Sequence, residues 1–388
     1  MKRTLAQFAI SVSLLCSSAL HASAAEVSIR RTPKDGRQPR VETGKDGTAH
    51  LIYFKGDPRN GDVFYAQRRT GQSEFGRPIK VNSRPGSAVA AGTIRGAHLA
   101  LGKNDRVHVA WMGSGKTAPH SPKSKHPLHP MLYTRMNDAG TGFEPERNLV
   151  NYAWGLDGGG SVAADSKGNV YVFWHADPTL KPMNEAGRSV FMTKSTNDGK
   201  DFAREENIVE EAFGACGCCG MKAFVDSGDR VFALYRTASR GSRDMNVLFA
   251  PPGGRTFVAC TVNRWKLEAC PMSSSNFGET KANVLFGTER AGKLFVNSFD
   301  RESARLNRTV ELTLGRRAKH PAIAVNSKGE ILVAWQEGAS FHTGGTLHYQ
   351  TFDASGQSTS RPQRVGKVPK FSLASVYADP EGRFGILY

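Results

Sequence analysis

The chain has 388 residues, of which 39% are apolar and 22% are charged, with 41 glycines and 19 prolines. This composition excludes a low-complexity chain and a small disulfide-held domain, and it allows a large apolar core. The formal net charge of +17 favours anionic partners, such as nucleic acid, acidic glycans, anionic lipids or acidic small molecules.

The N-terminus has the pattern of a secretory signal. A positively charged start with Lys2 and Arg3 precedes an apolar run from Leu5 to Leu15, and small residues at 22–25 resemble a cleavage site. We therefore expect a signal peptide over residues 1–25 and a periplasmic or secreted protein. The apolar run is too short to span a bilayer and no other stretch approaches the necessary length, so no transmembrane segment is expected.

Export also bears on the partners that the basic charge favours. Nucleic acid is not expected, because the protein leaves the cytoplasm and its sequence has no basic run with regularly interleaved aromatic residues. A solvated basic surface is the simpler interpretation of the charge, and a dedicated site for an acidic ligand is the alternative. We expect a monomer.

One strand pattern recurs along the whole chain. A small or polar segment leads into a short apolar strand, a tight turn, and a second strand that usually ends in an aromatic residue. Turns such as Asp46-Gly47 and Asn104-Asp105 contain residues that tolerate positive φ, as two-residue hairpin loops require. The seven second strands are predicted over residues 48–53, 106–111, 169–174, 230–235, 283–288, 330–335 and 383–388.

The spacing of these hairpins predicts a β-propeller. They recur every 47 to 63 residues, which suits four-stranded blades joined by loops of different length. The seventh hairpin ends at the C-terminus without outer strands, and residues 27–31 could supply one and close the ring. We predict an all-β fold, with one propeller domain over residues 26–388 and seven four-stranded blades, six blades being the alternative.

Short segments in the loops carry a further repeat. The segment Ser195–Phe202 reads STNDGKDF, residues 138–143 and 254–257 are weaker copies, and residues 68–75 are degenerate. These segments resemble the Asp-box (BNR) repeats of the sialidase, or neuraminidase, superfamily. In that family the boxes are structural turns remote from catalysis, so the resemblance implies the fold of the mature chain and carries no information about activity.

The resemblance implies a set of candidate catalytic residues. Exo-sialidases hold a substrate carboxylate with three arginines, which Arg37, Arg236 and Arg290 would supply here, because a planar guanidinium binds both carboxylate oxygens. Asp62 would be the acid/base residue. If the chain is an enzyme, the resemblance implies an exo-α-sialidase. An aspartate that solvates a loop and charges at exposed strand ends are the alternative interpretations.

The C-terminal segment departs from the family pattern. Leu373 occupies the position of the nucleophilic tyrosine, and Tyr377 is displaced by four residues. The segment Cys219–Met221 replaces the glutamate that would activate the tyrosine. Because a tyrosine without a nearby base is a weak nucleophile at neutral pH, the sequence favours a protein that binds an anionic ligand over an active sialidase, with acidic glycan as the leading candidate.

Five cysteines follow the signal: Cys216, Cys218, Cys219, Cys260 and Cys270. An odd number in an oxidising compartment leaves at least one cysteine unpaired or bound to metal. A disulfide between blades, or one between Cys260 and Cys270, is the expectation from the compartment. A bond between Cys218 and Cys219 is disfavoured, because adjacent Cα atoms are only about 3.8 Å apart.

The repeat register places most of these cysteines at one end of the propeller channel. The equivalent positions, sixteen residues before each strand end, are Arg37, Arg95, Gly158, Cys219, Met272, Lys319 and Ser372. We predict that the segments 216–219 and 270–272 meet at this mouth as one cluster. Its soft sulfur atoms would suit Cu(I) or Zn²⁺, with candidate ligands at Cys216, Cys218, Cys219, Cys270, Met272 and His320.

The same mouth should gather positive charge. Arg37, Arg95, Lys222 and Lys319 come from different blades and should converge there, while apolar strands fill the body of the molecule. This convergence predicts a site for an anionic ligand, an acidic glycan or another acidic small molecule.

Overall fold

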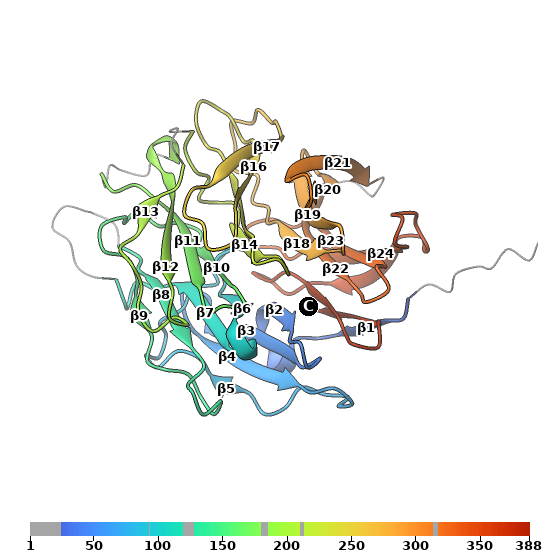
Figure 1. Cartoon of the computed structure of the whole chain (residues 1–388), viewed down its shortest axis with the longest axis horizontal. Coiled ribbons are helices and arrows are strands. Elements are labelled where there is room, and N and C mark those ends of the chain that lie inside the picture. Colours follow the sequence, from blue (N-terminus) through green and yellow to red (C-terminus); the bar gives the residue numbers. More distant parts are fainter. Residues whose placement is uncertain (1–24, 93, 119–127, 180–184, 210–212, 313–316) are drawn as a thin grey trace, which may run out of the picture.

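Seven sheets surround a central axis in the computed structural model (Figure 1). The structure describes residues 25–92, 94–118, 128–179, 185–209, 213–312 and 317–388. The predicted signal peptide lies outside the described residues except for residue 25. No helix in the described part of the chain is long and apolar enough to cross a membrane.

Each sheet is one blade, numbered here in chain order. Blade 1 consists of β2 (Arg37–Thr43), β3 (Ala49–Asp57), β4 (Asn60–Arg68) and β5 (Ile79–Lys80). Blade 2 consists of β6 (His98–Leu101), β7 (Val107–Met112), β8 (Met131–Arg135) and β9 (Arg147–Asn148). Blade 3 consists of β10 (Gly160–Ala164), β11 (Val170–Ala176), β12 (Ser189–Ser195) and β13 (Glu206–Asn207). Blade 4 consists of β14 (Lys222–Val225), β15 (Val231–Arg236), β16 (Met245–Ala250) and β17 (Val258–Asn263). Blade 5 consists of β18 (Asn276–Glu279), β19 (Asn283–Arg290), β20 (Lys293–Asp300) and β21 (Arg305–Leu312). Blade 6 consists of β22 (Ala318–Val325), β23 (Ile331–Glu337), β24 (Thr346–Phe352) and β25 (Gln363–Lys367).

Blade 7 closes the ring with strands from both ends of the chain. It contains β26 (Ser375–Ala378), β27 (Phe384–Leu387) and β1 (Val27–Arg30), and β1 pairs with β27 in parallel, with Ile29 opposite Ile386. Figure 1 shows the blue β1 beside the red C-terminal strands. The prediction of seven blades is confirmed and the six-blade alternative is wrong, although the seventh blade has three strands and not four.

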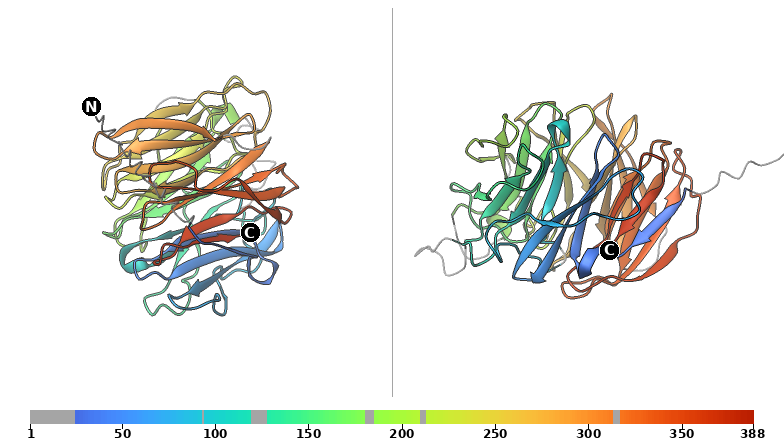
Figure 2. Two further views of the ribbon diagram at one scale, coloured as in Figure 1. Left: turned by 90° about the vertical axis from the view of Figure 1, so that its right-hand side faces the viewer. Right: turned by 90° about the horizontal axis from the view of Figure 1, so that it is seen from below.

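The first strand of every blade lines the axis. β2 contacts both β6 and β26, and the series continues through β10, β14, β18 and β22. The side views in Figure 2 show the blades fanned around this axis. The only helical segments in the described residues are three short 3-10 turns over Pro33–Asp35, Lys103–Asp105 and Glu185–Gly187.

The core lies between neighbouring blades. The aromatic residue that ends a second strand packs on the preceding blade: Trp111 joins Ile52 and Phe54 of blade 1, and Trp174 joins Tyr133 of blade 2. Side chains of this size contribute about 1.5–3 kcal/mol each when fully buried. The recurring aromatic in the sequence therefore fills the space between two sheets.

The hairpin turns have the backbone that the sequence predicts. Asn104 and Asp105 both have positive φ, of 56° and 54°, and Gly47 has φ 80°. In blade 3 the Asp165 carboxylate accepts hydrogen bonds from the backbone N–H groups of Lys167 and Asn169 and thereby holds the turn between β10 and β11.

The best Asp-box match connects two blades. The Ser195 hydroxyl accepts hydrogen bonds from the backbone of Asn197 and Gly199, which shapes the turn after β12. Asp198 at its tip forms an ion pair with Arg106 of blade 2, at 2.5 Å, and its carbonyl accepts a hydrogen bond from Arg135. In this protein the turn therefore ties blade 3 to blade 2.

Candidate functional site

The segments predicted to ring one mouth of the channel lie against one another across the blades. The Gln38 backbone N–H donates to the Ser372 hydroxyl at 2.8 Å, and the Lys319 ammonium donates to the Pro271 carbonyl at 2.6 Å. Gly158 has φ 104°, and a Cβ there would collide with the carbonyl of Gly217 in the next blade. Blades 3 and 4 thus meet backbone to backbone at this mouth.

Three of the four predicted basic residues already have partners, namely Arg95, Lys319 and Lys222, the last of which pairs with Glu42. Arg95 forms an ion pair with Asp157 at 2.6 Å, donates to the Ala91 carbonyl and lies over the Phe341 ring. Lys319 is held by the Pro271 carbonyl. The predicted convergence of free positive charge is therefore not found for Arg95, Lys222 and Lys319.

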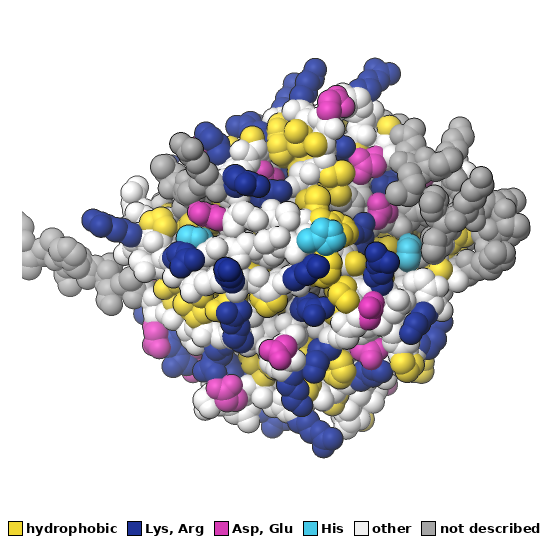
Figure 3. Space-filling model, turned by 180° about the vertical axis from the view of Figure 1, so that it is seen from behind, with side chains coloured by type: hydrophobic (Ala, Val, Ile, Leu, Met, Phe, Trp, Pro, Cys, Tyr) yellow, Lys and Arg dark blue, Asp and Glu magenta, His cyan; other side chains and the backbone are white. Residues whose placement is uncertain are grey.

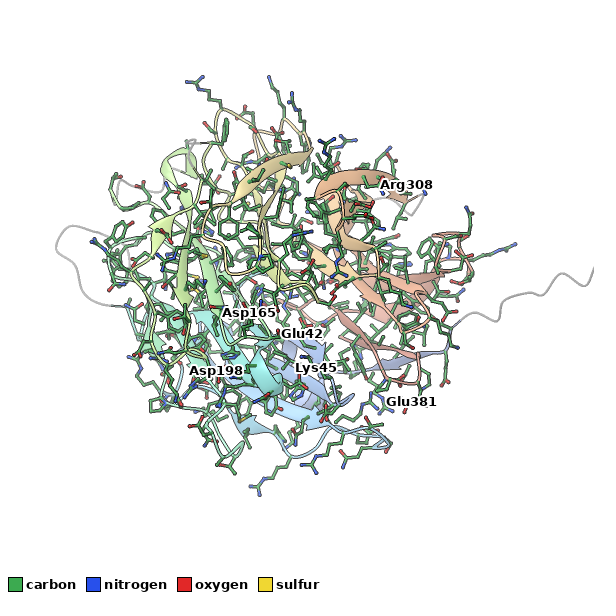
Figure 4. All side chains as sticks on the ribbon, in the orientation of Figure 1. Glu42, Lys45, Asp165, Asp198, Arg308 and Glu381 are labelled. Carbon is green, nitrogen blue, oxygen red and sulfur yellow. The ribbon has the colours of Figure 1, made fainter. Side chains whose placement is uncertain are left out.

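A second group of basic side chains lies inside the channel. Arg40, His98, Lys222 and His320 come from β2, β6, β14 and β22, with exposures of 8%, 3%, 7% and 3%. The Lys222 ammonium lies 3.6 Å from the Glu42 carboxylate of β2, so this ion pair joins blades 1 and 4 across the axis. Figure 4 shows Glu42 near the middle of the ring.

The pKa shifts of these groups have a common cause. Burial lowers the pKa of Arg40 to about 10, although Glu42 opposes the change. Burial, with Arg40 as an additional cause, also lowers the pKa of Lys222 and of His98. His320 has a pKa of about 3, because it is buried and lies near Lys319 and Arg40. Arg40 and Lys222 thus share one nearby carboxylate, that of Glu42.

Buried nitrogen atoms of Arg40 and His320, and of Arg37 at the predicted mouth position of blade 1, lack hydrogen-bond partners in the described part of the chain. Among the described residues, Arg37 Nη1, Arg40 Nε and His320 Nε2 are buried and make no hydrogen bond. A buried donor without a partner costs about 1–3 kcal/mol, and more when it is charged. These atoms are therefore suited to an anionic ligand that enters the channel. The basic exterior would also attract such a ligand: Figure 3 shows Lys and Arg side chains scattered over the visible part of one face, with fewer Asp and Glu side chains between them.

The other two candidate clamp residues, Arg236 and Arg290, already contact other groups of the protein. Arg236 is buried at the end of β15 and donates to the carbonyls of Arg243 and Glu289, at 2.8 and 2.7 Å. Arg290 lies 4.8 Å from the centre of the Phe295 ring. Arg37 and Arg236 each have a buried nitrogen without a hydrogen-bond partner among the described residues. The Arg236 guanidinium already donates to two carbonyl groups, so Arg37 is the better candidate for binding a ligand carboxylate.

Asp62 lies near the start of β4 and is held as a carboxylate. Burial alone would raise its pKa, but hydrogen bonds from Asn82 and Gly86 and the ammonium of Lys80, at 3.1 Å, lower it below the usual value. A general acid needs the opposite shift. The position suits a residue that fixes the loop of blade 1.

The segment that departs from the sialidase pattern offers no nucleophile to the channel. Leu373 is 1% exposed. Tyr377 is buried on β26, and its hydroxyl accepts a hydrogen bond at 3.2 Å from Arg68, at the end of the third strand of blade 1. The tyrosine hydroxyl is therefore directed to an outer strand.

The structure brings four cysteines together at the mouth. The Sγ atoms of Cys216, Cys218 and Cys219 lie within 4.8 Å of one another, and those of Cys216 and Cys218 are 3.2 Å apart. Cys218 also lies within 4.8 Å of Cys270 and of a carboxylate oxygen of Glu185. Sequence reasoning missed Glu185, because it belongs to a loop between β11 and β12 that the repeat does not include.

The remaining sulfur predictions have mixed outcomes. Every cysteine among the described residues is a free thiol, so the expected disulfide is not found in that part of the chain. Cys260 lies on the outer strand β17 and belongs to neither group of candidate ligands. His320 belongs to neither group either. Met272 has φ 53° and is half-buried, and its role as a ligand stays a prediction.

Comparisons with known proteins give the fold. No protein-family model matches the sequence, and a search of curated proteins finds no match. Two solved complexes of an α-L-arabinofuranosidase of Fusarium graminearum are each 11% identical to this chain. The complex with an iminosugar inhibitor matches 86% of this chain and 98% of its own chain, with a TM-score of 0.53. The complex with arabinobiose matches 88% of this chain and 97% of its own chain, with a TM-score of 0.51. The NanB sialidase of Streptococcus pneumoniae is 11% identical over 92% of this chain, with a TM-score of 0.48, and the chain spans 66% of its length. The likeness to the arabinofuranosidase establishes the propeller architecture only.

Proposed function

We propose that this protein is an exported propeller that binds an anionic ligand through its central channel, and that the ligand is an acidic glycan. The observation that carries the proposal is the pair of buried cations Arg40 and Lys222, which share the one nearby carboxylate of Glu42. A carboxylate from a ligand would balance this charge and accept hydrogen bonds from Arg40 Nε and Arg37 Nη1.

Two further considerations support a carbohydrate. The family that the loop repeats resemble recognises acidic sugars through arginines. The fold also accommodates carbohydrate, since the F. graminearum enzyme was solved with arabinobiose. A neutral sugar alone would leave the channel charges unpaired, so the acidic group is the part of the ligand that this channel selects.

Binding without turnover is the form of the function that we propose. Leu373 has no nucleophilic atom, the Tyr377 hydroxyl is bound to Arg68, and the Asp62 carboxylate has a lowered pKa. The alternative is an active exo-α-sialidase. Release of a fluorophore from a sialoside by the wild-type protein, reduced by Asp62→Asn, would favour that alternative and contradict ours.

The experiment that tests the proposal is a calorimetric titration of the full mature chain with sialyllactose, a glucuronic-acid-terminated oligosaccharide and lactose. We expect saturable binding of an acidic probe and none of lactose. Arg40→Met should weaken binding about 10- to 100-fold, the effect of losing a hydrogen bond between charged groups. The matched control is Arg361→Met, on the exposed edge of blade 6, which should bind as the wild type does. Equal affinity for lactose, or an equal loss in both variants, would overturn the proposal.

A further inference from the structure

We propose that the sulfur atoms of Cys216, Cys218 and Cys219 bind one Cu(I) ion. The three Sγ atoms lie within 4.8 Å of one another, and the shortest separation is 3.2 Å. Two sulfur atoms bound to one ion at about 2.3 Å are at most about 4.6 Å apart. The three cysteines therefore need only small side-chain movements to share an ion. This site shares no residue with the proposed anion site and goes beyond the function proposed above.

The backbone holds the three cysteines in place before any ion arrives. The Cys216 N–H donates to the Arg236 carbonyl at 2.9 Å, and the Gly220 N–H donates to the Ser273 carbonyl at 3.0 Å. Gly217 lies so close to the Arg188 guanidinium that a Cβ would be 2.5 Å from Nη1. The loop that carries the cysteines is thus fixed to blades 4 and 5, and the preorganised sulfurs lose little freedom on binding.

The surroundings of the sulfurs suit a negatively charged metal centre. A Cu(I) ion with three thiolates carries net negative charge, which needs positive charge nearby in a buried site. Arg236 interacts electrostatically with Cys219, and Arg243 with Cys216 and Cys218. Arg236 Nε is buried without a hydrogen-bond partner among the described residues. A neutral disulfide would not need this charge.

The number of ligands favours Cu(I) over Zn²⁺. The compact group contains three sulfur atoms alone, and thiolates bind either ion. Structural zinc sites are almost always four-coordinate, but Cys270 belongs to a second group, with Cys218 and Glu185. The Glu185 carboxylate is already held by Arg243 at 2.9 Å. Cys270 is exposed and adjacent to Cys218, so it offers an entry route for the ion.

The test is a competition titration of the full mature chain, reduced and kept free of oxygen, with Cu(I) and a chromogenic Cu(I) chelator. We expect one equivalent of Cu(I) per chain. Cys219→Ser should lower the affinity at least about 100-fold, because loss of even an outer partner of a ligand costs 10- to 100-fold. The matched control is Cys260→Ser on the outer strand β17, which should bind as the wild type does. If Cys219→Ser does not fold, the half-buried Cys218→Ser replaces it.

X-ray absorption of the loaded wild type provides a second readout that does not depend on affinity. A first shell of sulfur alone would support the proposal. Oxygen or nitrogen ligands in that shell, no retention of Cu(I), an equal loss of affinity in Cys260→Ser, or preferential retention of Zn²⁺ when both ions are supplied would each overturn it. None of these results would bear on anion binding, so the two proposals fail separately.

Discussion

The substitution Arg40→Met tests whether the channel charge is unbalanced when no ligand is bound. Arg40 is 8% exposed, and among the described residues it has no ion-pair partner within 4 Å and no hydrogen-bond partner for Nε. The lowering of its pKa from 12.5 to about 10 corresponds to about 3 kcal/mol by which the fold disfavours the charged guanidinium. Methionine removes this penalty and has a similar length.

We therefore expect Arg40→Met to raise the free energy of unfolding by about 1–3 kcal/mol in the absence of ligand, as replacement of buried charges by apolar residues can do. The assay is urea denaturation at neutral pH, with Arg361→Met as an exposed control that should change stability by less than about 0.5 kcal/mol. With an acidic oligosaccharide present, the wild type should gain more stability than Arg40→Met does. A loss of more than about 1 kcal/mol in ligand-free Arg40→Met, with an unchanged denaturant slope, would refute the reasoning.

Three other predictions concern the fold. The folded-state pKa of His320, about 3, lies below the unfolded value near 6.5. The contribution of neutral His320 to stability is therefore complete above about pH 6.5 and is lost as the pH falls toward 3. The urea midpoint of the wild type should decrease when the pH is lowered from about 7 to 4, and that of His320→Gln should decrease less. A chain that begins at residue 32 lacks β1 and exposes the edge of β27, so it should unfold at lower urea and aggregate more than one that begins at residue 26; equal midpoints and solubility would contradict the closure of the ring. Asp198→Ala leaves Arg106 without that carboxylate and should cost about 1–3 kcal/mol in chemical denaturation, whereas an unchanged midpoint would contradict a link between blades 2 and 3.

Much of the architecture could be predicted because each blade repeats its own local signals. Turn residues with positive φ, such as Asn104, stand before apolar strands that end in an aromatic, and both features follow from the hairpin and from packing on the preceding blade. The closing strand could be predicted because the C-terminal hairpin lacked outer partners. The seventh blade has three strands because its hairpin gains one outer strand, β1, as the sequence suggests, so the general expectation of four strands per blade is wrong for this blade alone.

The channel site was predicted only in part. The predicted mouth position of blade 1 was Arg37, but Arg40 lies three residues later, at the repeat position that His98 and Lys222 occupy in blades 2 and 4. A search for charged residues at equivalent positions of the inner strands would have found this group. The repeat places Asp157 beside Gly158, the mouth position of the next blade, but it does not show that the Asp157 side chain pairs with Arg95.

The sulfur cluster was also predicted only in part. The repeat register placed segments 216–219 and 270–272 at one mouth, since both occupy equivalent positions of consecutive blades. The contact of Glu185 with this group depends on how a loop of blade 3 folds, and loops of unequal length carry no repeat information. For the same reason, the count of cysteines and their compartment were insufficient to predict their pairing.

The most direct test of anion binding in the channel is the electron density there in a crystal of the mature protein grown with an excess of sialyllactose or a glucuronic-acid-terminated oligosaccharide. Our account predicts that the carboxylate of the sugar lies within about 3 Å of Arg40 Nε and Arg37 Nη1. A sugar bound elsewhere, with only ordered water between Arg40, Lys222 and Glu42, would contradict it.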